Sequence, residues 1–425
     1  MAKKNDRKHI YGYADWNGID GPHLMGVLSV DVKMGEEVFS FSYDEKWIAK
    51  GFAQELDPDL QFFLGDQFLE VGKSNFGNFT DSCPDRWGRV LLQRREAVLA
   101  RKEDRTPRKL RESDYLLGVY DGNRMGALRF KLDLDGDFLN NKTEFATPPL
   151  AKLRELEQAS LKIEEDGDET SEEYIKWLNL LISPGSSLGG ARPKANIVDD
   201  KGNLWIAKFP SRADDSNVGG WEMVAYQIAI EAGINMSECK VQKFNNDNHT
   251  FLTKRFDREQ KNRIHFASAM TCLGSVDGND HSLGVSYLDL AEFIIRSGSN
   301  VDEDLEELWR RIVLSICISN VDDHLRNHGF ILEESGWRLS PAYDINPSVD
   351  GNGLMLNISE HDNSQSLELA LSVIKYFRID ESRAKKIVEQ VKVSASKWRA
   401  LANKLGISRS KQDLMARAFR VIEQI

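Results

Sequence analysis

The sequence predicts an α+β fold in which a strand-rich part of the chain is followed by a helical part. Alternating apolar residues and short apolar runs predict strands through the first 260 residues. Beyond about residue 285 the spacing of apolar residues is mostly that of helices. A length of 425 residues exceeds what one ordinary core holds, so two or more domains are expected. We expect a cleft between the strand-rich lobe and the helical lobe.

The first block, residues 1–148, is predicted to be a compact α+β subdomain. Residues 23–32 and 36–49 are its first predicted strands, and the second places its aromatic residues on one face. A helix is predicted from Pro84 to Arg101, because proline suits the first turn of a helix. Residues 125–134 predict a closing strand.

Two further blocks follow this subdomain. Residues 149–260 are predicted to form a strand-rich lobe that contains a glycine-rich loop, and residues 261–425 a helical lobe. An acidic run at residues 164–173 is interpreted as a solvated loop.

Composition and charge exclude several classes of protein. Apolar residues are 41% and charged residues 29% of the chain, the balance of a soluble globular protein. The first residues carry no apolar run typical of a signal peptide, and no apolar stretch approaches the ~20 residues of a membrane span. The four cysteines form no C-x-x-C pair, which favours reduced thiols in the cytoplasm. A net charge of -11 means that DNA could be reached only through a local basic patch or a basic partner.

The glycine-rich loop, SPGSSLGGARPK at residues 183–194, has the composition of a phosphate-binding loop. Its glycines free backbone N–H groups to point into a concavity, and Arg192 and Lys194 add positive charge. The loop matches neither G-x-G-x-x-G nor a Walker motif. A tight turn between a helix and a strand is therefore the alternative interpretation.

Lys208 lies inside the short predicted strand NLWIAKF, between apolar neighbours. A lysine in such a strand is usually a solvated charge on a sheet edge. The alternative is an ammonium held over nucleotide phosphates and oriented by a carboxylate. Glu222, in the next predicted helix, is the candidate for that carboxylate.

The stretch SNVDDHLRNHGF, residues 319–330, gathers groups that bind metals or move protons. Asp322 and Asn327 have the separation of the kinase catalytic loop H-R-D-x-x-x-x-N, in which the aspartate accepts a proton and the asparagine oxygen binds Mg²⁺. Asp344 follows a predicted hairpin at residues 328–339, which would return it beside Asn327 as a second ligand.

Each of these pieces also has a plain structural interpretation. The aspartates could cap turns, and His324 and His328 could suggest a zinc pair, although the glycine and asparagines around them indicate a loop and not a helix. The order of these pieces along the chain decides between the structural and the catalytic interpretation. A phosphate loop, a strand lysine, D-x-x-x-x-N and a later aspartate follow one another as in protein kinases.

These motifs resemble those of the HipA family of serine/threonine kinases, the toxins of HipBA-type toxin–antitoxin pairs. SSLGGARPK, WIAKF, TKRFDR, NVDDHLRN and SPAYD carry the resemblance, supported by CPDRWGR and MGALRF in the first block. The resemblance covers most of the chain. It implies a protein-kinase-like two-lobed fold with an additional N-terminal α+β subdomain.

The resemblance also implies a role for each matched residue. Asp322 would be the catalytic base, with His324 supporting its loop, and Asn327 and Asp344 would bind Mg²⁺. Ser187 corresponds to the serine that members autophosphorylate, although Ser183 and Ser186 leave the modified position open. Lys254 to Phe256 would form the hinge that meets adenine. Lys254 stands where an acidic residue is usual, but backbone atoms make the main contacts of this hinge. The nucleotide-binding set would be Ser187, Gly189, Gly190, Lys194, Lys208, Lys254, Phe256, Asp257 and Tyr343.

The function that the resemblance implies is phosphorylation, with ATP and Mg²⁺, of serine or threonine on a cytoplasmic protein. By analogy the target is an aminoacyl-tRNA synthetase, whose modification would inhibit translation and growth, and a HipB-like helix-turn-helix antitoxin would be the partner that reaches DNA. One alternative is a co-repressor or binding module that acts with such an antitoxin. The others are a kinase for a small molecule or lipid, and metal-assisted hydrolysis.

Overall fold

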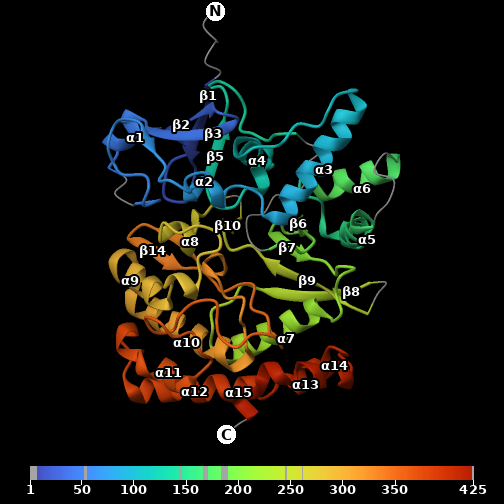
Figure 1. The fold of residues 1–425 in the computed structure, drawn as a ribbon, viewed down its shortest axis with the longest axis vertical. Helices are drawn as coiled ribbons and strands as arrows, with labels where there is room; N and C mark the ends of the chain where they lie inside the picture. The colour runs from blue at the N-terminus through green and yellow to red at the C-terminus, as the bar shows by residue number, and fades with distance from the viewer. Residues whose placement is uncertain are drawn as a thin grey trace, which may run out of the picture. The chain divides into compact units, whose positions relative to one another are not determined.

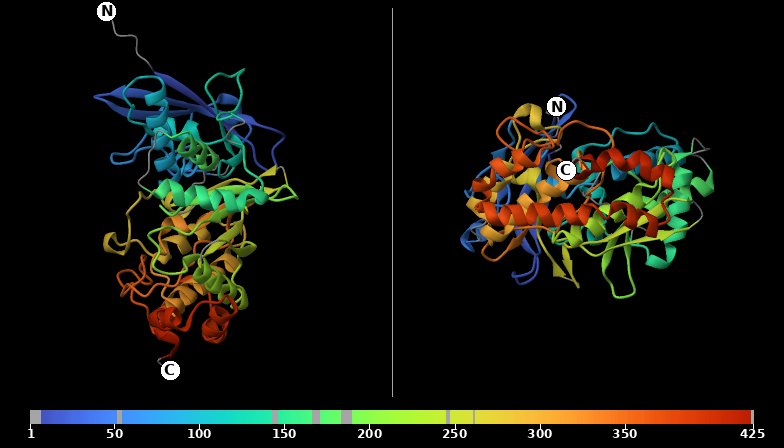
Figure 2. Two further views of the ribbon diagram at one scale, coloured as in Figure 1. Left: turned by 90° about the vertical axis from the view of Figure 1, so that its right-hand side faces the viewer. Right: turned by 90° about the horizontal axis from the view of Figure 1, so that it is seen from below.

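The computed structural model divides the chain into two compact units (Figures 1 and 2). The first contains residues 1–207 and 257–267, and the second contains residues 208–256 and 268–425. The chain thus passes from one unit to the other three times, whereas the predicted blocks were continuous. The predicted boundaries at residues 148 and 260 remain a prediction. The structure describes residues 7–51, 55–142, 146–165, 171–182, 190–244, 247–260 and 262–423.

A five-stranded antiparallel sheet of order β4-β3-β2-β1-β5 underlies the first unit. The aromatic residues of β3 lie on one buried face as predicted, because Phe39, Phe41 and Tyr43 are 2%, 0% and 4% exposed. The strands of this sheet are β1 (Lys8–Ala14), β2 (His23–Lys33), β3 (Glu36–Tyr43), β4 (Gln67–Phe68) and β5 (Leu128–Lys131).

The end predicted for β3 was wrong. The predicted strand ran to residue 49, but residues Glu45–Ala49 form the short helix α1. The Asp44 side chain accepts a hydrogen bond of 2.9 Å from the backbone N–H of Lys46, and this contact caps the start of a helix. A local side-chain bond therefore overrides the strand pattern here.

Helices and short strands complete the first unit. The helix predicted from Pro84 begins at Arg86, because the Asp85 side chain accepts from the N–H of Gly88 at 2.8 Å and makes Asp85 the capping residue. The helices are α2 (Gly77–Asp81), α3 (Arg86–Lys102), α4 (Glu112–Gly118), α5 (Leu153–Glu164) and α6 (Glu172–Ile182). The strands are β6 (Lys194–Val198), β7 (Leu204–Lys208), β10 (Arg258–Glu259), β11 (Asn262–Arg263) and β12 (Phe266–Ser268), of which β7 and β12 run across a boundary between the units.

Two antiparallel hairpins and a set of helices form the second unit. The helices α11 to α15, coloured orange to red, lie together near the C-terminus (Figures 1 and 2). The central helix is α10, which packs against α9, α11, α12 and α15. The strands are β8 (Cys239–Lys243), β9 (His249–Lys254), β13 (Gly329–Glu333) and β14 (Gly336–Leu339). The helices are α7 (Val218–Glu231), α8 (Ala269–Cys272), α9 (Tyr287–Ser297), α10 (Val301–Ile318), α11 (Leu367–Ser372), α12 (Glu381–Ala395), α13 (Trp398–Lys404), α14 (Arg409–Met415) and α15 (Arg420–Glu423).

Two sequence predictions can be compared with these elements. The predicted hairpin is present as β13 and β14, which pair from Phe330 with Leu339 to Glu333 with Gly336. Within the described residues, no helix combines the length and the apolar character that crossing a bilayer requires.

His265 is a buried titratable residue of the first unit. Its ring stacks on that of Trp16, with centroids 5.2 Å apart, and its side chain is almost completely enclosed. Burial disfavours the charged imidazolium and lowers the pKa of His265 to about 3.

We expect His265 to make the protein sensitive to acid. The folded state keeps the ring neutral, while the unfolded chain takes up a proton below about pH 6.5, so the free energy of unfolding falls as the pH drops from there towards 3. The full slope is about 1.4 kcal/mol per pH unit. Urea unfolding of wild type and His265→Phe at several pH values should show a flatter profile for the variant. Parallel profiles would contradict the assignment, and the exposed His361→Phe serves as the matched control.

Candidate active site

The loop that carries Asp322 begins where α10 ends. Ser319, the residue after this helix, has a left-handed backbone with φ of 51°, which turns the chain sharply away from the helix axis. A single 3₁₀ turn, Leu325–Asn327, then leads into β13. The polar stretch at residues 319–328 is therefore a loop held at both ends by regular structure, as the sequence predicted.

A buried ion triad lies at the centre of the candidate site. Lys208 ends β7, and its ammonium donates to Glu222 Oε1 of α7 at 2.5 Å and to Asp344 Oδ1 at 2.6 Å. Lys208 is only 8% exposed. Burial alone would lower the pKa of Lys208, but Asp344 and Glu222 outweigh it and hold the pKa above its ordinary value. The ammonium therefore stays charged at neutral pH.

Asp344 adopts an unusual backbone conformation. Its φ is 58°, a region that residues other than glycine rarely occupy and that costs about 1–3 kcal/mol. Besides the ammonium of Lys208, the Nδ2 group of Asn346 donates to Asp344 Oδ1 at 3.2 Å. These two contacts hold the carboxylate of Asp344 in place.

Asn327 presents a buried oxygen that fits a metal ligand. Its Nδ2 group donates to the carbonyl oxygen of Asp322 at 2.8 Å, which orients the amide. The Oδ1 atom is buried and has no hydrogen-bond partner within the described residues, and the same holds for Asn346 Oδ1. Leaving a buried polar atom without a partner is costly, so a ligand is expected there. Amide and carboxylate oxygens are what Mg²⁺ prefers, so Asn327 and Asp344 fit this cation.

Hydrogen bonds bring the loop and the segment around Asp344 side by side. The hydroxyl of Tyr343 donates to the carbonyl oxygen of Arg326 at 2.8 Å. The backbone N–H of Asn346 donates to Asn320 Oδ1 at 3.2 Å, and that of Ser348 to Ser319 O at 3.1 Å. The side chain of Asp322 is exposed on this loop, and the N–H of His324 donates to its carbonyl oxygen at 3.0 Å. Asp322, Asn327, Asp344 and Lys208 therefore belong to one connected group of residues.

Asp323 supports this loop from its buried side, and it was not among the site residues predicted from the sequence. Asp323 is buried and accepts hydrogen bonds from the hydroxyls of Tyr287 at 2.7 Å and Ser315 at 3.3 Å, and His328 Nε2 lies 3.0 Å from it. Burial alone would raise the pKa of Asp323, but His328 and Tyr287 outweigh it and lower the pKa. The only sequence signal was the pair of adjacent aspartates, one of which faces solvent.

His328 thus contacts a carboxylate of the loop itself. Within the described residues, no group of three or more His, Cys, Asp or Glu side chains is arranged to hold a metal ion. A cation at Asn327 and Asp344 would therefore depend on amide oxygens as well as a carboxylate.

Phe256 and Tyr343, which are predicted to contact the nucleotide, lie close together in the second unit. The ring of Phe256 lies 5.8 Å from that of Tyr343, measured between centroids. The N–H of Lys254, at the end of β9, donates to the carbonyl oxygen of Glu238 at 2.8 Å. Their contact with a nucleotide stays a prediction.

Lys194 and Asp257 belong to the first unit, and each is already engaged there. The ammonium of Lys194 is buried and donates to Asp85 Oδ2 and to the carbonyl oxygen of Gly190, both at 2.7 Å. Asp257 is completely buried, and its Oδ2 accepts from the N–H of Gly126 at 2.8 Å and from Arg258 at 2.7 Å. Sequence spacing gave no sign of these partners. Gly190 is exposed, and Ser183, Ser186, Ser187 and Gly189 lie outside the described residues.

Known proteins share both sequence and fold with this chain. A protein of Haemophilus influenzae named "Putative kinase" is 28% identical over an alignment of 181 residues, and the match covers 38% of this chain and 52% of that protein. "Putative kinase Y4mE" of Sinorhizobium fredii is 23% identical over an alignment of 186 residues, and the match covers 38% of this chain and 42% of that protein. The chain thus matches about half or less of the length of these relatives.

The fold is that of a solved toxin–antitoxin protein. The HipA structure from the Shewanella oneidensis MR-1 complex of HipA, HipB and operator DNA superposes over 94% of both chains with a TM-score of 0.64, at 16% identity. The predicted kinase-like α+β fold class is thereby confirmed. The sequence model of the HipA-like C-terminal domain matches residues 186–398, about half of the chain. With this match the resemblance seen in the motifs becomes membership, and the chain belongs to the HipA family.

Proposed function

We propose that this protein is an ATP- and Mg²⁺-dependent serine/threonine protein kinase. The observation that carries the proposal is the buried ammonium of Lys208 held between Glu222 and Asp344. Protein kinases need a strand lysine paired with a helix glutamate, and an aspartate that binds the metal. The names of the Haemophilus and Sinorhizobium relatives also support a kinase.

Each residue of the group has a chemical task in this proposal. A bound Mg²⁺ would neutralise charge on the phosphates, and Asn327 and Asp344 would hold it. Lys208 would bind phosphate oxygens, with Glu222 fixing its direction. The exposed carboxylate of Asp322 would accept the proton of the attacking hydroxyl, on a loop that His324 supports. Phe256, Tyr343 and the backbone of Lys254 would contact the base, and Gly189, Gly190, Lys194 and Asp257 complete the proposed nucleotide set.

We further propose that the kinase is the toxin of a type II toxin–antitoxin pair. Its target would be a cytoplasmic protein, by analogy an aminoacyl-tRNA synthetase, and its partner a HipB-like helix-turn-helix antitoxin. The Shewanella complex contains HipA, HipB and operator DNA, which supports such a partner. A net charge of -11 supports indirect contact with DNA, because the chain as a whole repels phosphates.

A co-repressor that only binds is the second candidate, and the presence of operator DNA in the Shewanella complex favours it. The two candidates differ in nucleotide binding. Calorimetry of the purified protein with ATP should show binding that depends on Mg²⁺ if the protein is a kinase. If ATP does not bind, the co-repressor interpretation alone survives.

Asp322→Gln should strongly slow phosphoryl transfer while the protein stays folded. The side chain is exposed, so its replacement costs little stability, but the proton acceptor is lost. A positioned general base contributes about 10²- to 10⁴-fold to the rate, and transfer from labelled ATP should fall by that factor. The exposed Glu360→Gln is the matched control. Undiminished transfer in Asp322→Gln would remove this residue from the mechanism.

Asn327→Ala should weaken binding of Mg²⁺–ATP and leave binding of metal-free ATP unchanged. The variant removes the unpartnered Oδ1 atom, and the loss of one interaction with a charged group predicts about tenfold weaker binding. Calorimetry with and without Mg²⁺ measures both quantities, and Asn352→Ala, at an exposed position, is the control. An equal loss in both titrations would mean that Asn327 shapes the loop and does not hold the metal.

Phosphorylation of Ser187 should switch the kinase off. A phosphate adds nearly two negative charges to a loop that must attract the phosphates of ATP. Ser187→Asp should therefore lose transfer activity and Ser187→Ala should keep it, with Ser183→Asp and Ser186→Asp as comparisons for the open position. Mass spectrometry of active and inactive preparations supplies the direct test. Equal activity with Ser187 fully phosphorylated and fully free would contradict the switch.

A further inference from the structure

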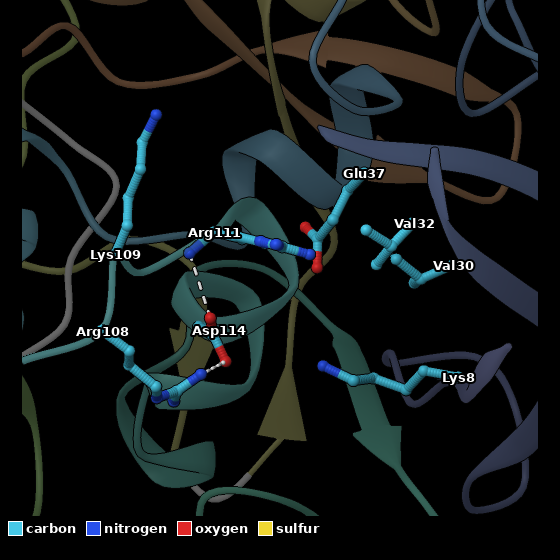
Figure 3. A pocket seen from close by; sticks show the side chains of 8 residues that line it. All are labelled: Lys8, Val30, Val32, Glu37, Arg108, Lys109, Arg111 and Asp114. Carbon is cyan, nitrogen blue, oxygen red and sulfur yellow. Dashed lines mark hydrogen bonds and ion pairs between the residues drawn. The ribbon is translucent and has the colours of Figure 1, made fainter. Parts of the chain in front are cut away.

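The first unit contains a pocket of about 220 Å³ that none of the proposed active-site residues line (Figure 3). One wall is the face of the sheet formed by β1, β2 and β3. Lys8 pairs with Val30 and Glu37 with Val32 across neighbouring strands, so these four side chains share that face. The other wall is the segment 108–114, which leads into α4.

The carboxylates of the pocket are already supplied with donors. Glu37 accepts from the backbone N–H of Ser113 at 2.9 Å and from its hydroxyl at 2.5 Å. Asp114 accepts from Arg108 at 2.9 Å and from the backbone N–H of Arg111 at 3.0 Å (Figure 3). Each carboxylate therefore receives two hydrogen bonds from the chain itself.

The cationic side chains that line the pocket, in contrast, have hydrogen-bond donors that the described part of the chain does not use. Within the described residues the guanidinium of Arg111 and the ammonium of Lys109 form no ion pair and donate no hydrogen bond, and an arginine alone carries five N–H groups. Lys8 uses one of its three hydrogens on the hydroxyl of Ser113, at 2.8 Å. Arg111 reaches towards Glu37, Lys8 enters from the strand side, and Lys109 extends outward (Figure 3).

The charge of the lining indicates the kind of ligand. Four cations and two carboxylates leave a net charge of +2 on these residues, in a chain whose total is -11. A phosphate monoester carries about -1.5 to -2 at neutral pH and offers three acceptor oxygens, whereas a carboxylate offers one charge. The planar guanidinium of arginine matches phosphate oxygens in a bidentate way. The volume is below that of typical pockets for drug-sized ligands, which argues against a whole nucleotide.

We propose that this pocket binds a phosphate monoester, either a small free molecule or a phosphorylated side chain. Arg111 is its main ligand, Lys8 and Lys109 neutralise its remaining charge, and Val30 and Val32 contact the carbon atoms next to the ester. The site is independent of the proposed kinase activity, because it uses none of the same residues.

Calorimetry of the full chain tests the proposal, with inorganic phosphate, O-phosphoserine, a phosphoserine peptide and acetate as probes. Wild type should bind the three phosphates, and Arg111→Gln should bind them about tenfold more weakly. Arg111→Lys keeps the charge but loses the bidentate geometry, so its affinity should lie between those two. The exposed Lys46→Gln, in the same unit, should bind like wild type. Kinase activity of Arg111→Gln should be unchanged.

The outcomes separate the possible sources of the ligand. Tighter binding of the peptide than of inorganic phosphate would identify a phosphorylated protein side chain, and equal binding would identify a free phosphate compound. Acetate that binds as well as phosphate, or an Arg111→Gln variant that binds phosphate like wild type, would overturn the proposal. If the protein proves not to be a kinase, the test of this pocket still holds, because it measures phosphate binding alone.

Discussion

The placement of Lys208 in a buried position constrains the whole candidate site. Removing an ammonium from water is costly, and in this protein Glu222 and Asp344 together supply the compensating charge. These partners lie 14 and 136 residues further along the chain. The helix α7 and a segment that follows the β13–β14 hairpin must therefore meet at Lys208. Without both carboxylates the ammonium would be an uncompensated charge in the interior, which is far more costly than the loss of a surface ion pair.

The same constraint places the groups that would do chemistry. Because Asp344 is tied to Lys208, its neighbours Tyr343 and Asn346 are held where they bond to Arg326 and Asn320 of the loop. From below, the buried carboxylate of Asp323 fixes that loop through a tyrosine, a serine and a histidine. The loop is thus held on two sides before any ligand arrives. Such preorganisation lowers the entropy that a reaction must lose to align its groups.

Local patterns in the sequence predicted several of the elements and one contact of the candidate site. The sequence predicted a mostly helical chain beyond about residue 285, where α10 lies, and it predicted the β13–β14 hairpin. Glu222 was the predicted partner of Lys208, and the two side chains lie 2.5 Å apart in the structure. What the sequence could not predict depends on partners far away in the chain. The assignment of Lys194 to the nucleotide stays a prediction, while the structure shows that its ammonium pairs with Asp85, 109 residues distant. No spacing rule reveals such a partner, since only the folded chain brings the two together.

Asp257 shows how a family motif can serve architecture as well as chemistry. TKRFDR and MGALRF both support the resemblance. The last two residues of TKRFDR, Asp257 and Arg258, belong to the first unit and contact the start of MGALRF there. The N–H of Gly126 donates to Asp257, and Arg258 donates to the carbonyl oxygens of Gly126 and of Arg124, the residue before the motif. Gly126 has a φ of 69°, and a Cβ there would lie 3.1 Å from the backbone nitrogen of Phe266, so only glycine suits the contact. These bonds explain why residues 257–267 return to the first unit. A motif match by itself therefore does not distinguish a residue that binds the nucleotide from one that only stabilises the fold.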